Sequence, residues 1–486
     1  MNVLFAAVEM SPLAKVGGLG DVVGSLPRAL RAGGADVRVA MPMHGSIERT
    51  ALPGLRHLLQ DVRVPWFDGE QRVDVWQADV RGVPVYLLEN ERYFKRPNVY
   101  GFDDDKDRFL FFCDALLAAA PHLGFAPDVV HAQDWHAALL LTRLAADPAH
   151  AWAGAGRVYT IHNLALQGTF DAGFAAHFGI GAGSLVAPAG LPHEVVYSAM
   201  AQGILHADRV STVSDTYAKE IMTPEYGAGL DGLLRARAAF VSGIVNGIDY
   251  EEFDPATDAA LAKSYSVDTL DDRAADKRAL QAKAGLPEHE RSLVFGVVTR
   301  LWAQKGIDLV AVAFGAMLAT RDMQLIILGT GDEETHRVLL ALQDKYPRKV
   351  KIWLEFNPPL GQEIYGGCDV FLMPSRYEPC GLGQLISLRY GAVPLVRRTG
   401  GLADTVQNVD LPLSSGTGFV FDAADAHELE HAAERALAAF ENPAGWRAIQ
   451  ERGMRQDWSW GRAAGKYVEL YELARADRAA DRAPAT

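Results

Sequence analysis

Short apolar runs alternate with longer amphipathic stretches along most of the 486-residue chain, and this alternation constrains the fold more than any other feature. Each run has the length and side-chain types of a buried strand, while the stretches between runs have helical periodicity. Parallel strands need connections of a dozen or more residues, which these stretches supply. The pattern predicts an α/β fold with parallel sheets. The runs are Val3–Val8, Val37–Met41, Val83–Leu88, Val129–His131, Val158–Ile161, Val210–Val213, Leu293–Val298, Gln324–Leu328, Lys349–Trp353, Val370–Met373 and Val393–Val396.

The length of the chain and one interruption of this pattern predict two domains. A single hydrophobic core rarely grows beyond about 250–300 residues. The alternation stops over residues 250–290, where the chain is charged and poor in apolar residues. We therefore expect one domain over residues 1–248 and a second over 249–457. An aromatic helix is expected over 458–475, followed by a flexible polar tail over 476–486.

Composition and charge exclude several classes of protein. With 47 Lys and Arg against 61 Asp and Glu, the formal net charge is 47 − 61 = −14, which repels nucleic acid and anionic lipid. The three cysteines form no CxxC pair, which is typical of a reducing compartment rather than of a disulfide framework or a thiolate zinc site. No secretory signal and no apolar stretch of about 20 residues is visible. We expect a cytoplasmic protein with no nucleic-acid or membrane partner.

A short internal repeat occurs once in each predicted domain. Lys15-Val-Gly-Gly-Leu-Gly-Asp21 recurs as Arg398-Thr-Gly-Gly-Leu-Ala-Asp404, and each copy lies between an apolar run and a helical stretch. A Gly-Gly turn such as Gly17-Gly18 lets backbone N–H groups approach an anion, and the flanking cation adds a full charge. One interpretation is two ordinary helix starts. Two copies favour the other interpretation, which is a charged ligand shared between the domains.

A pair of cations follows a predicted strand in the second domain. Arg300 and Lys305 come directly after the run that ends at Val298, and ligands of open α/β sheets bind beyond the carboxyl ends of strands. Two cations at such a turn can converge on one diphosphate. The alternative is a solvated pair on a loop, which is the usual place of Lys and Arg. The position at a strand end favours the diphosphate.

A turn rich in proline and glycine follows the run Val370–Met373. Glu378 lies in this turn, just before a helix start formed by Cys380, Gly381 and Leu382. A carboxylate among backbone N–H donors is suited to holding sugar hydroxyls. The alternative is that Glu378 compensates the charge of the helix start.

Two histidine motifs follow strands of the first predicted domain. Their strings are HAQDWH, which contains Asp134, and TIHN, which contains His162 and Asn163. The first string lacks the i, i+4 histidine spacing of zinc proteases, so we expect no metal site.

Two other strings resemble ligand motifs without meeting their requirements. Asp103-Asp104-Asp105 has the DxD form of metal-dependent glycosyltransferases, but its acidic surroundings favour a solvated loop. Leu328-Gly-Thr-Gly331 lacks the third glycine of a dinucleotide loop and is followed by carboxylates. We therefore expect no NAD site there.

Together the motifs resemble those of the bacterial glycogen synthase and plant starch synthase family. The resemblance implies the GT-B architecture, in which two Rossmann-like parallel-sheet domains face a central cleft and a C-terminal helix returns to the N-terminal domain. It implies retaining transfer of glucose from ADP-glucose to the non-reducing 4-OH end of an α-1,4-glucan such as glycogen, with no metal and no cofactor. The matching strings, which run from residue 15 to about 409, are KVGGLGDVVGSLP, HAQDWH, TIHNLALQG, ADRVSTVS, SGIVNGID, TRLWAQKGIDL, PSRYEPCGLGQL and VRRTGGLADTV.

The resemblance also implies roles for individual residues. The cations among them would neutralise the diphosphate, and the aromatic residue would stack on the purine. The residues expected at the reaction centre are Glu378, Lys305, Arg300, His162 and Asp21. The residues expected to bind the nucleotide sugar are Lys15, Gly17, Gly18, Arg300, Lys305, Phe356, Glu378, Cys380, Gly381 and Leu382. Other residues expected to line the cleft are Asp134, Asn163 and Asn246.

Some positions depart from the family pattern. They bear on acceptor preference, nucleotide preference and rate more than on the type of reaction. Two rival classes therefore stay open: another GT-B enzyme, such as a phosphorylase, an epimerase or a transferase with a different donor, and a weakly active glucan-binding relative. The departing residues are Leu166, Ala201, Asp215, Pro358 and Gly383.

Overall fold

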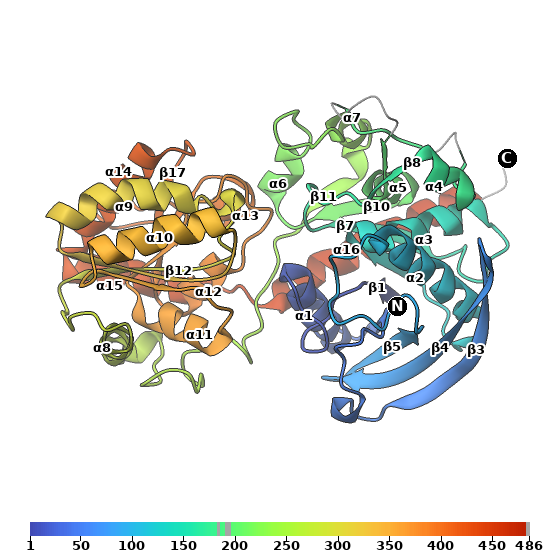
Figure 1. Cartoon of the computed structure of the whole chain (residues 1–486), viewed down its shortest axis with the longest axis horizontal. Helices are drawn as coiled ribbons and strands as arrows, with labels where there is room; N and C mark the ends of the chain where they lie inside the picture. Colours follow the sequence, from blue (N-terminus) through green and yellow to red (C-terminus); the bar gives the residue numbers. More distant parts are fainter. Residues whose placement is uncertain (182–184, 190–195, 483–486) are drawn as a thin grey trace. The chain divides into compact units, whose positions relative to one another are not determined.

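The computed structural model describes residues 1–181, 185–189 and 196–482, which fall into two compact units (Figure 1). Unit 1 comprises Met1–Gly247 together with the segment that begins at Trp460, and unit 2 comprises Ile248–Ser459. The sequence predicts boundaries after residues 248 and 457, whereas the contacts divide the chain after Gly247 and after Ser459. Each unit contains a parallel sheet and helices, which confirms the predicted α/β fold class.

Unit 1 is built on a nine-stranded sheet in the order β11-β10-β7-β6-β1-β2-β5-β4-β3. The strands from β11 to β5 in this order are parallel, and β4 and β3 form an antiparallel hairpin at one edge. Every residue of β6 and every residue of β1 after Asn2 is buried, as parallel strands covered on both faces require. The strands are β1 (Asn2–Ala6), β2 (Asp36–Pro42), β3 (Arg56–Trp66), β4 (Gly69–Val80), β5 (Val83–Glu89), β6 (Val129–Gln133), β7 (Gly156–Ile161), β10 (Arg209–Thr212) and β11 (Val241–Gly243), with β8 (Thr169–Asp171) and β9 (Val196–Ser198) in a separate small sheet.

The helices of unit 1 connect these strands and cover the sheet. The first, α1, packs against the C-terminal helix α16, which also contacts β7 and β10. The described helices are α1 (Gly18–Ala32), α2 (Asp105–Ala119), α3 (Asp134–Ala146), α4 (Ala172–His177), α5 (Ala199–His206), α6 (Asp215–Glu220), α7 (Asp231–Ala236) and α16 (Trp460–Arg482).

Unit 2 is built on a six-stranded parallel sheet in the order β14-β13-β12-β15-β16-β17. Helices α9 and α10 lie on one side of this sheet, and α8 and α11 lie on the other (Figure 1). The strands are β12 (Leu293–Val298), β13 (Met323–Leu328), β14 (Val350–Trp353), β15 (Val370–Met373), β16 (Val393–Arg397) and β17 (Phe419–Phe421). The helices are α8 (Arg273–Lys283), α9 (Ile307–Thr320), α10 (Glu333–Lys345), α11 (Pro358–Gly367), α12 (Gly383–Arg389), α13 (Gly400–Thr405), α14 (Ala426–Phe440) and α15 (Pro443–Met454).

The C-terminal helix belongs to unit 1, as the resemblance implies. Buried Tyr471 on α16 lies with its hydroxyl oxygen 2.9 Å from Nδ1 of buried His131 on β6. The sequence predicts this helix over 458–475 and a flexible tail from 476, but α16 begins at Trp460 and continues to Arg482. The extension is rich in Ala and Arg, which favour helix. It is also held by an ion pair, because Arg209 Nε lies 2.6 Å from Asp477 Oδ2. Residues 483–486 of the predicted tail lie outside the described residues.

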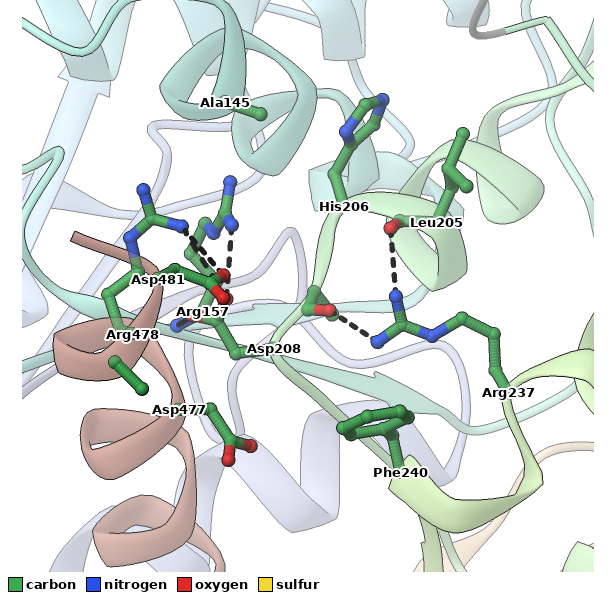
Figure 2. A pocket seen from close by; sticks show the side chains of 12 residues that line it. Ala145, Arg157, Leu205, His206, Asp208, Arg237, Phe240, Asp477, Arg478 and Asp481 are labelled. Carbon is green, nitrogen blue, oxygen red and sulfur yellow. Dashed lines mark hydrogen bonds and ion pairs between the residues drawn. The ribbon is translucent and has the colours of Figure 1, made fainter. Parts of the chain in front are cut away.

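A hollow of about 540 Å³ lies beside the end of α16 (Figure 2). Its arginines are held within unit 1. The guanidinium groups of Arg157 and Arg478 lie 3.0 and 3.7 Å from the Asp208 carboxylate, and Arg237 donates to two backbone carbonyl oxygens. The described residues that line this hollow include none of the predicted site residues. Its charges therefore anchor α16 to the strands.

Two further observations concern the expected surroundings of the protein. Within the described ranges, no helix combines the length and the apolar character that crossing a membrane requires. Cys113, Cys368 and Cys380 are all buried free thiols.

Candidate active site

The carboxyl ends of β12 and β15 bring a lysine and a glutamate of unit 2 together. These two strands pair directly, and Lys305 and Glu378 lie in the loops that follow them. Lys305 Nζ lies 2.6 Å from Glu378 Oε2, and the Ser375 hydroxyl donates to the same oxygen over 2.9 Å. Glu378 is only 5% exposed, so the lysine and the hydroxyl compensate a buried carboxylate. The structure thus places these two predicted residues in direct contact.

Gly306 allows the two loops to approach each other. Its φ is +66°, and a Cβ atom there would lie 2.2 Å from the carbonyl oxygen of Pro374. The backbone N–H of Arg376 also donates to the carbonyl of Gln304 over 2.8 Å. A larger residue at 306 would separate the loops and move Lys305 away from its carboxylate partner.

Two predicted donor-binding side chains of unit 2 are exposed. The guanidinium of Arg300 lies 4.3 Å from the ring centroid of Trp302, at the end of β12. Phe356 follows β14 and is 83% exposed. An exposed aromatic ring presents a face on which a planar base can stack.

The second copy of the repeat holds the turn that contains Glu378. Added Cβ atoms at Gly400 and Gly401 would lie 1.9 Å from the Glu378 carbonyl oxygen and 2.1 Å from that of Cys380. The N–H of Gly401 donates to the Glu378 carbonyl over 3.1 Å. Glycine is required here because one backbone approaches another. This copy therefore shapes the neighbouring turn.

A glutamine side chain fixes the residues between Glu378 and α12. Gln384 Nε2 donates to the carbonyl oxygens of Cys380 and Gly381, both over 3.0 Å. Gly381 has a φ of +75°, a backbone conformation that residues other than glycine rarely adopt. Leu382 immediately precedes α12. The three residues predicted at this helix start therefore lie in a rigid turn.

The first copy of the repeat differs from the second in its glycines. Gly17 has an extended backbone, and an added Cβ at Gly17 or Gly18 would have no neighbour within 4 Å among the described atoms. Neither backbone conformation nor packing therefore demands glycine at these positions. Lys15 Nζ lies 2.5 Å from Asp21 Oδ1, and burial raises the pKa of Asp21, although Lys15 opposes the rise. The open space lies beside a cation.

Glu9, which is not among the predicted site residues, lies directly beside this turn. It is 3% exposed, and its Oε2 accepts the backbone N–H groups of Val16 and Gly17 over 2.6 and 2.9 Å. The Tyr100 hydroxyl donates to Oε1 over 2.5 Å. A charged residue directly after the apolar run Val3–Val8, and followed by Met10, is the sequence signal that could have pointed to it.

Asp134 organises the loop that follows β7. It lies at the carboxyl end of β6, where it starts α3 with a φ of +53°, an unusual conformation for a residue other than glycine. Its Oδ1 accepts the backbone N–H groups of His162 and Asn163 over 2.8 and 3.5 Å. Burial raises the pKa of Asp134 to about 7 and lowers that of His162 to about 3. The imidazole, with Nε2 2.8 Å from Gln133 Oε1, is therefore neutral at physiological pH.

Two further features of unit 1 could receive polar groups of a ligand. Asn246 is 5% exposed, and its amide oxygen has no hydrogen-bond partner among the described residues. A hollow of about 760 Å³ is lined by Trp135 and by exposed Leu166, one of the residues that depart from the family pattern. Trp135 precludes any side chain at position 168, because a Cβ on Gly168 would lie 2.0 Å from its ring.

The remaining sequence motifs have structural partners. His131 lies 2.6 Å from the Thr160 hydroxyl as well as contacting α16, and the His136 ring stacks on Tyr100 with centroids 4.9 Å apart. In the acidic loop, Asp104 pairs with Arg96 over 2.8 Å and Asp105 pairs with Arg108. The described parts of the chain contain no group of three or more His, Cys, Asp and Glu side chains arranged to hold a metal ion.

Comparisons with known proteins agree with this arrangement. A family model described as starch synthase catalytic domain matches residues 2–236, and one described as glycosyl transferases group 1 matches residues 277–449. The chain is 44% identical to a glycogen synthase of Syntrophotalea carbinolica, over 98% of this chain and 99% of the relative. It is 43% identical to a glycogen synthase of Moorella thermoacetica, over 98% of this chain and 97% of the relative.

A solved structure gives the same result. The catalytic domain of starch synthase IV from Arabidopsis thaliana, bound to ADP and acarbose, matches with a TM-score of 0.90 and 33% identity, over 98% of this chain and 99% of that chain. Fold and family matches define a glycosyltransferase of the two-domain GT-B class. Within that class, the chain belongs to the glycogen and starch synthase family. The predicted family, enzyme class and synthase function are confirmed.

Proposed function

We propose that this chain transfers glucose from ADP-glucose to the 4-OH group at the non-reducing end of an α-1,4-glucan, with retention at the anomeric carbon. The observation that carries the proposal is the contact between Lys305 and Glu378 at neighbouring strand ends, in a member of the synthase family. The names of the bacterial relatives support glycogen as the acceptor. The ADP and acarbose in the starch synthase IV structure support an adenine nucleotide and an oligosaccharide.

The donor would be held by cations, a turn and an aromatic ring. Arg300, Lys305 and Lys15 would neutralise the diphosphate, since preorganised charge stabilises a developing anion without reorganisation. The turn from Glu378 to Leu382 would hold the glucose hydroxyls. Phe356 would stack on the purine. The open space at Gly17 and Gly18 supports close approach of a ligand there.

The reaction would exchange one bond at the anomeric carbon for another. The bond between C1 of glucose and the β-phosphate oxygen breaks, and its electron pair leaves with ADP. The acceptor 4-OH oxygen bonds to C1 on the same face, and its proton passes to the departing phosphate oxygen. The positive charges of Lys305 and Arg300 would stabilise the negative charge that develops on the leaving group. Asp21 and the neutral imidazole of His162 would lie near the reacting sugar.

The acceptor would bind along unit 1. Asn163 belongs to the loop after β7, beside the 760 Å³ hollow, and Asp134 at the start of α3 accepts its backbone N–H. The tryptophan of this hollow offers an apolar ring face to a sugar. The buried amide oxygen of Asn246 could accept a sugar hydroxyl, because it has no partner among the described residues. Leu166 at the hollow would adjust acceptor preference rather than chemistry.

A donor panel tests the proposed function. Purified protein would be incubated with glycogen and ADP-, UDP- or GDP-glucose, and nucleotide release and chain extension would be measured. We expect release of ADP with matching extension, and retention of activity in EDTA because no divalent ion is proposed to take part. Extension only with another nucleotide sugar would replace the donor. In a parallel incubation with glycogen and inorganic phosphate, release of glucose 1-phosphate would indicate a phosphorylase.

The compartment stays a prediction. Three buried free thiols fit a reducing cytoplasm.

A further inference from the structure

A buried carboxylate behind the first Gly-Gly turn is neither part of the predicted site nor accounted for by packing. Removing Glu9 from water carries a free-energy cost unless each oxygen finds donors. Both oxygens do: Oε2 accepts from the N–H groups of Val16 and Gly17, and Oε1 accepts from the Tyr100 hydroxyl. Hydrogen bonds to a carboxylate are stronger than those to a neutral acceptor, so these three contacts hold their donors firmly.

These donors come from two segments that are distant in the sequence. Val16 and Gly17 precede α1, while Tyr100 lies in the loop before α2. One carboxylate therefore joins the repeat to a second loop, 91 residues away from Glu9. Burial and the neighbouring Glu9 raise the pKa of Tyr100 well above its ordinary value, so its hydroxyl stays protonated and donates.

The same carboxylate and the side chain of Lys15 approach one position on α1. A Cβ atom on Gly20 would lie 3.2 Å from Glu9 Oε2 and 3.1 Å from Lys15 Cγ. The glutamate and the lysine side chain thus both lie against one glycine of α1. The ammonium of Lys15 then reaches Asp21. Movement of Glu9 would release both the turn and the base of the lysine side chain.

We propose that Glu9 is a positioning residue for donor binding: it occupies the anion site made by the N–H groups of Val16 and Gly17, and so holds Lys15 and Gly18 in the geometry that receives the donor diphosphate. This inference rests on the proposed function, in which Lys15 and Gly18 contact the donor. It also changes the role expected for Gly17. The N–H of Gly17 donates to Glu9, and the absence of a side chain leaves space for the ligand.

Substitutions at Glu9 separate positioning from simple stabilisation. We expect Glu9→Ala to raise the donor KM and the Kd for ADP by about tenfold or more, since small displacements of a binding group carry large penalties. Glu9→Gln should return both constants to within about threefold of wild type, because an amide oxygen still accepts the two N–H groups. Glu9→Asp, which withdraws the carboxylate by about 1.5 Å, should resemble the alanine variant while keeping the charge.

Asp208 supplies the matched control. It is also a buried carboxylate that accepts a backbone N–H, from Arg157 over 2.7 Å, but it lies before β10, at the opposite end of the parallel strands. Asp208→Asn should lower the melting temperature while leaving the donor KM and the Kd for ADP at wild-type values. Melting temperature, acceptor KM and kcat would be measured for every variant, and Glu9→Asp serves where Glu9→Ala does not fold.

The outcomes separate the two proposals. Wild-type values of donor KM and Kd for ADP in folded Glu9→Ala or Glu9→Asp would overturn the positioning role and leave the proposed function intact. A wild-type chain that binds ADP without extending glycogen would overturn the proposed function alone, because the Kd comparison still tests Glu9. A wild-type chain that does not bind ADP would overturn both.

Discussion

At the scale of single residues, the two copies of the Gly-Gly repeat give opposite expectations. Gly18 is exposed, starts α1 and has open space around it, so Gly18→Ala should leave the melting temperature unchanged while raising the donor KM about tenfold. Gly401 lies against the Cys380 backbone, so Gly401→Ala should destabilise unit 2 by about 1–3 kcal/mol. Melting curves and donor titrations of both variants check this. A destabilised Gly18→Ala with a normal KM would refute the interpretation.

The exposed aromatic ring of Phe356 leads to a second prediction. At 83% exposure it contributes little to the core, so Phe356→Ala should keep the stability within about 0.5 kcal/mol. Stacking on the purine acts equally in the ground and transition states, so the donor KM should rise with a modest change in kcat. Leu411→Ala, at a residue that is 95% exposed, is the control and should change neither constant. An unchanged donor KM in Phe356→Ala would remove the stacking role.

The raised pKa of Asp134 predicts opposite pH dependences for activity and stability. Ionised Asp134 is the better acceptor for the N–H of His162, so kcat/KM should rise with pH through an apparent pKa near 7, while neutral His162 adds no limb above about pH 4. The folded-state pKa lies above the ordinary value of 3.8, so the stability that Asp134 contributes is complete below pH 3.8 and is lost as pH rises through 7. Asp134→Asn should flatten both profiles. Unchanged profiles in that variant would assign the limb to another group.

The sequence indicates candidate site residues, but it does not indicate the contacts that hold them in place. Lys305 and Glu378 could be predicted because each follows an apolar run, and strand ends are where ligands bind. The contacts of Glu9 could not be predicted, because two of its partners are backbone N–H groups and the third, Tyr100, lies 91 residues away. The packing role of Gly400 was also hidden, since the repeat looks the same in both copies until the backbone that it touches is known.

At the scale of elements, strands were predictable where both faces are buried. Every predicted apolar run coincides with a strand, to within about two residues at its ends. The hairpin β3–β4 was missed because it lies at the edge of the sheet and carries many exposed charged residues, so no continuous apolar run marks it. The short strands β11 and β17, of three residues each, are too brief to give a pattern.

Helix α16 leads to a prediction about the stability of unit 1. Tyr471 is fully buried, lies beside β6 and bonds His131, so Tyr471→Ala should cost about 3–5 kcal/mol of unfolding free energy. Leu473 lies on the same helix but is 48% exposed, and Leu473→Ala should cost far less. Urea titrations followed by circular dichroism compare the two variants. Equal losses would mean that α16 does not complete the core of unit 1.

At the scale of the whole molecule, the two units have separate hydrophobic cores. One core extends from β1 through β10 to α16, and the main core of unit 2 lies within Leu293–Ile449. Separate cores predict two unfolding transitions rather than one. Because Tyr471→Ala removes contacts within one core only, it should lower one transition and thereby assign it to unit 1.

The same separation allows donor binding to be assigned to a unit. ADP at about one hundred times its Kd should stabilise the unit that binds it by about 2.7 kcal/mol, and the proposed contacts with Lys305 and Phe356 lie in unit 2. Lys15 is the cation proposed to contact the diphosphate from unit 1, so we expect ADP to raise chiefly the transition that Tyr471→Ala leaves unchanged. Lys305→Ala should abolish most of this shift, whereas Lys345→Ala, which removes an exposed charge from α10, should retain it. Scanning calorimetry with and without ADP measures both. A full shift in Lys305→Ala would exclude this lysine from nucleotide binding and leave the charge on the leaving group to Arg300 and Lys15.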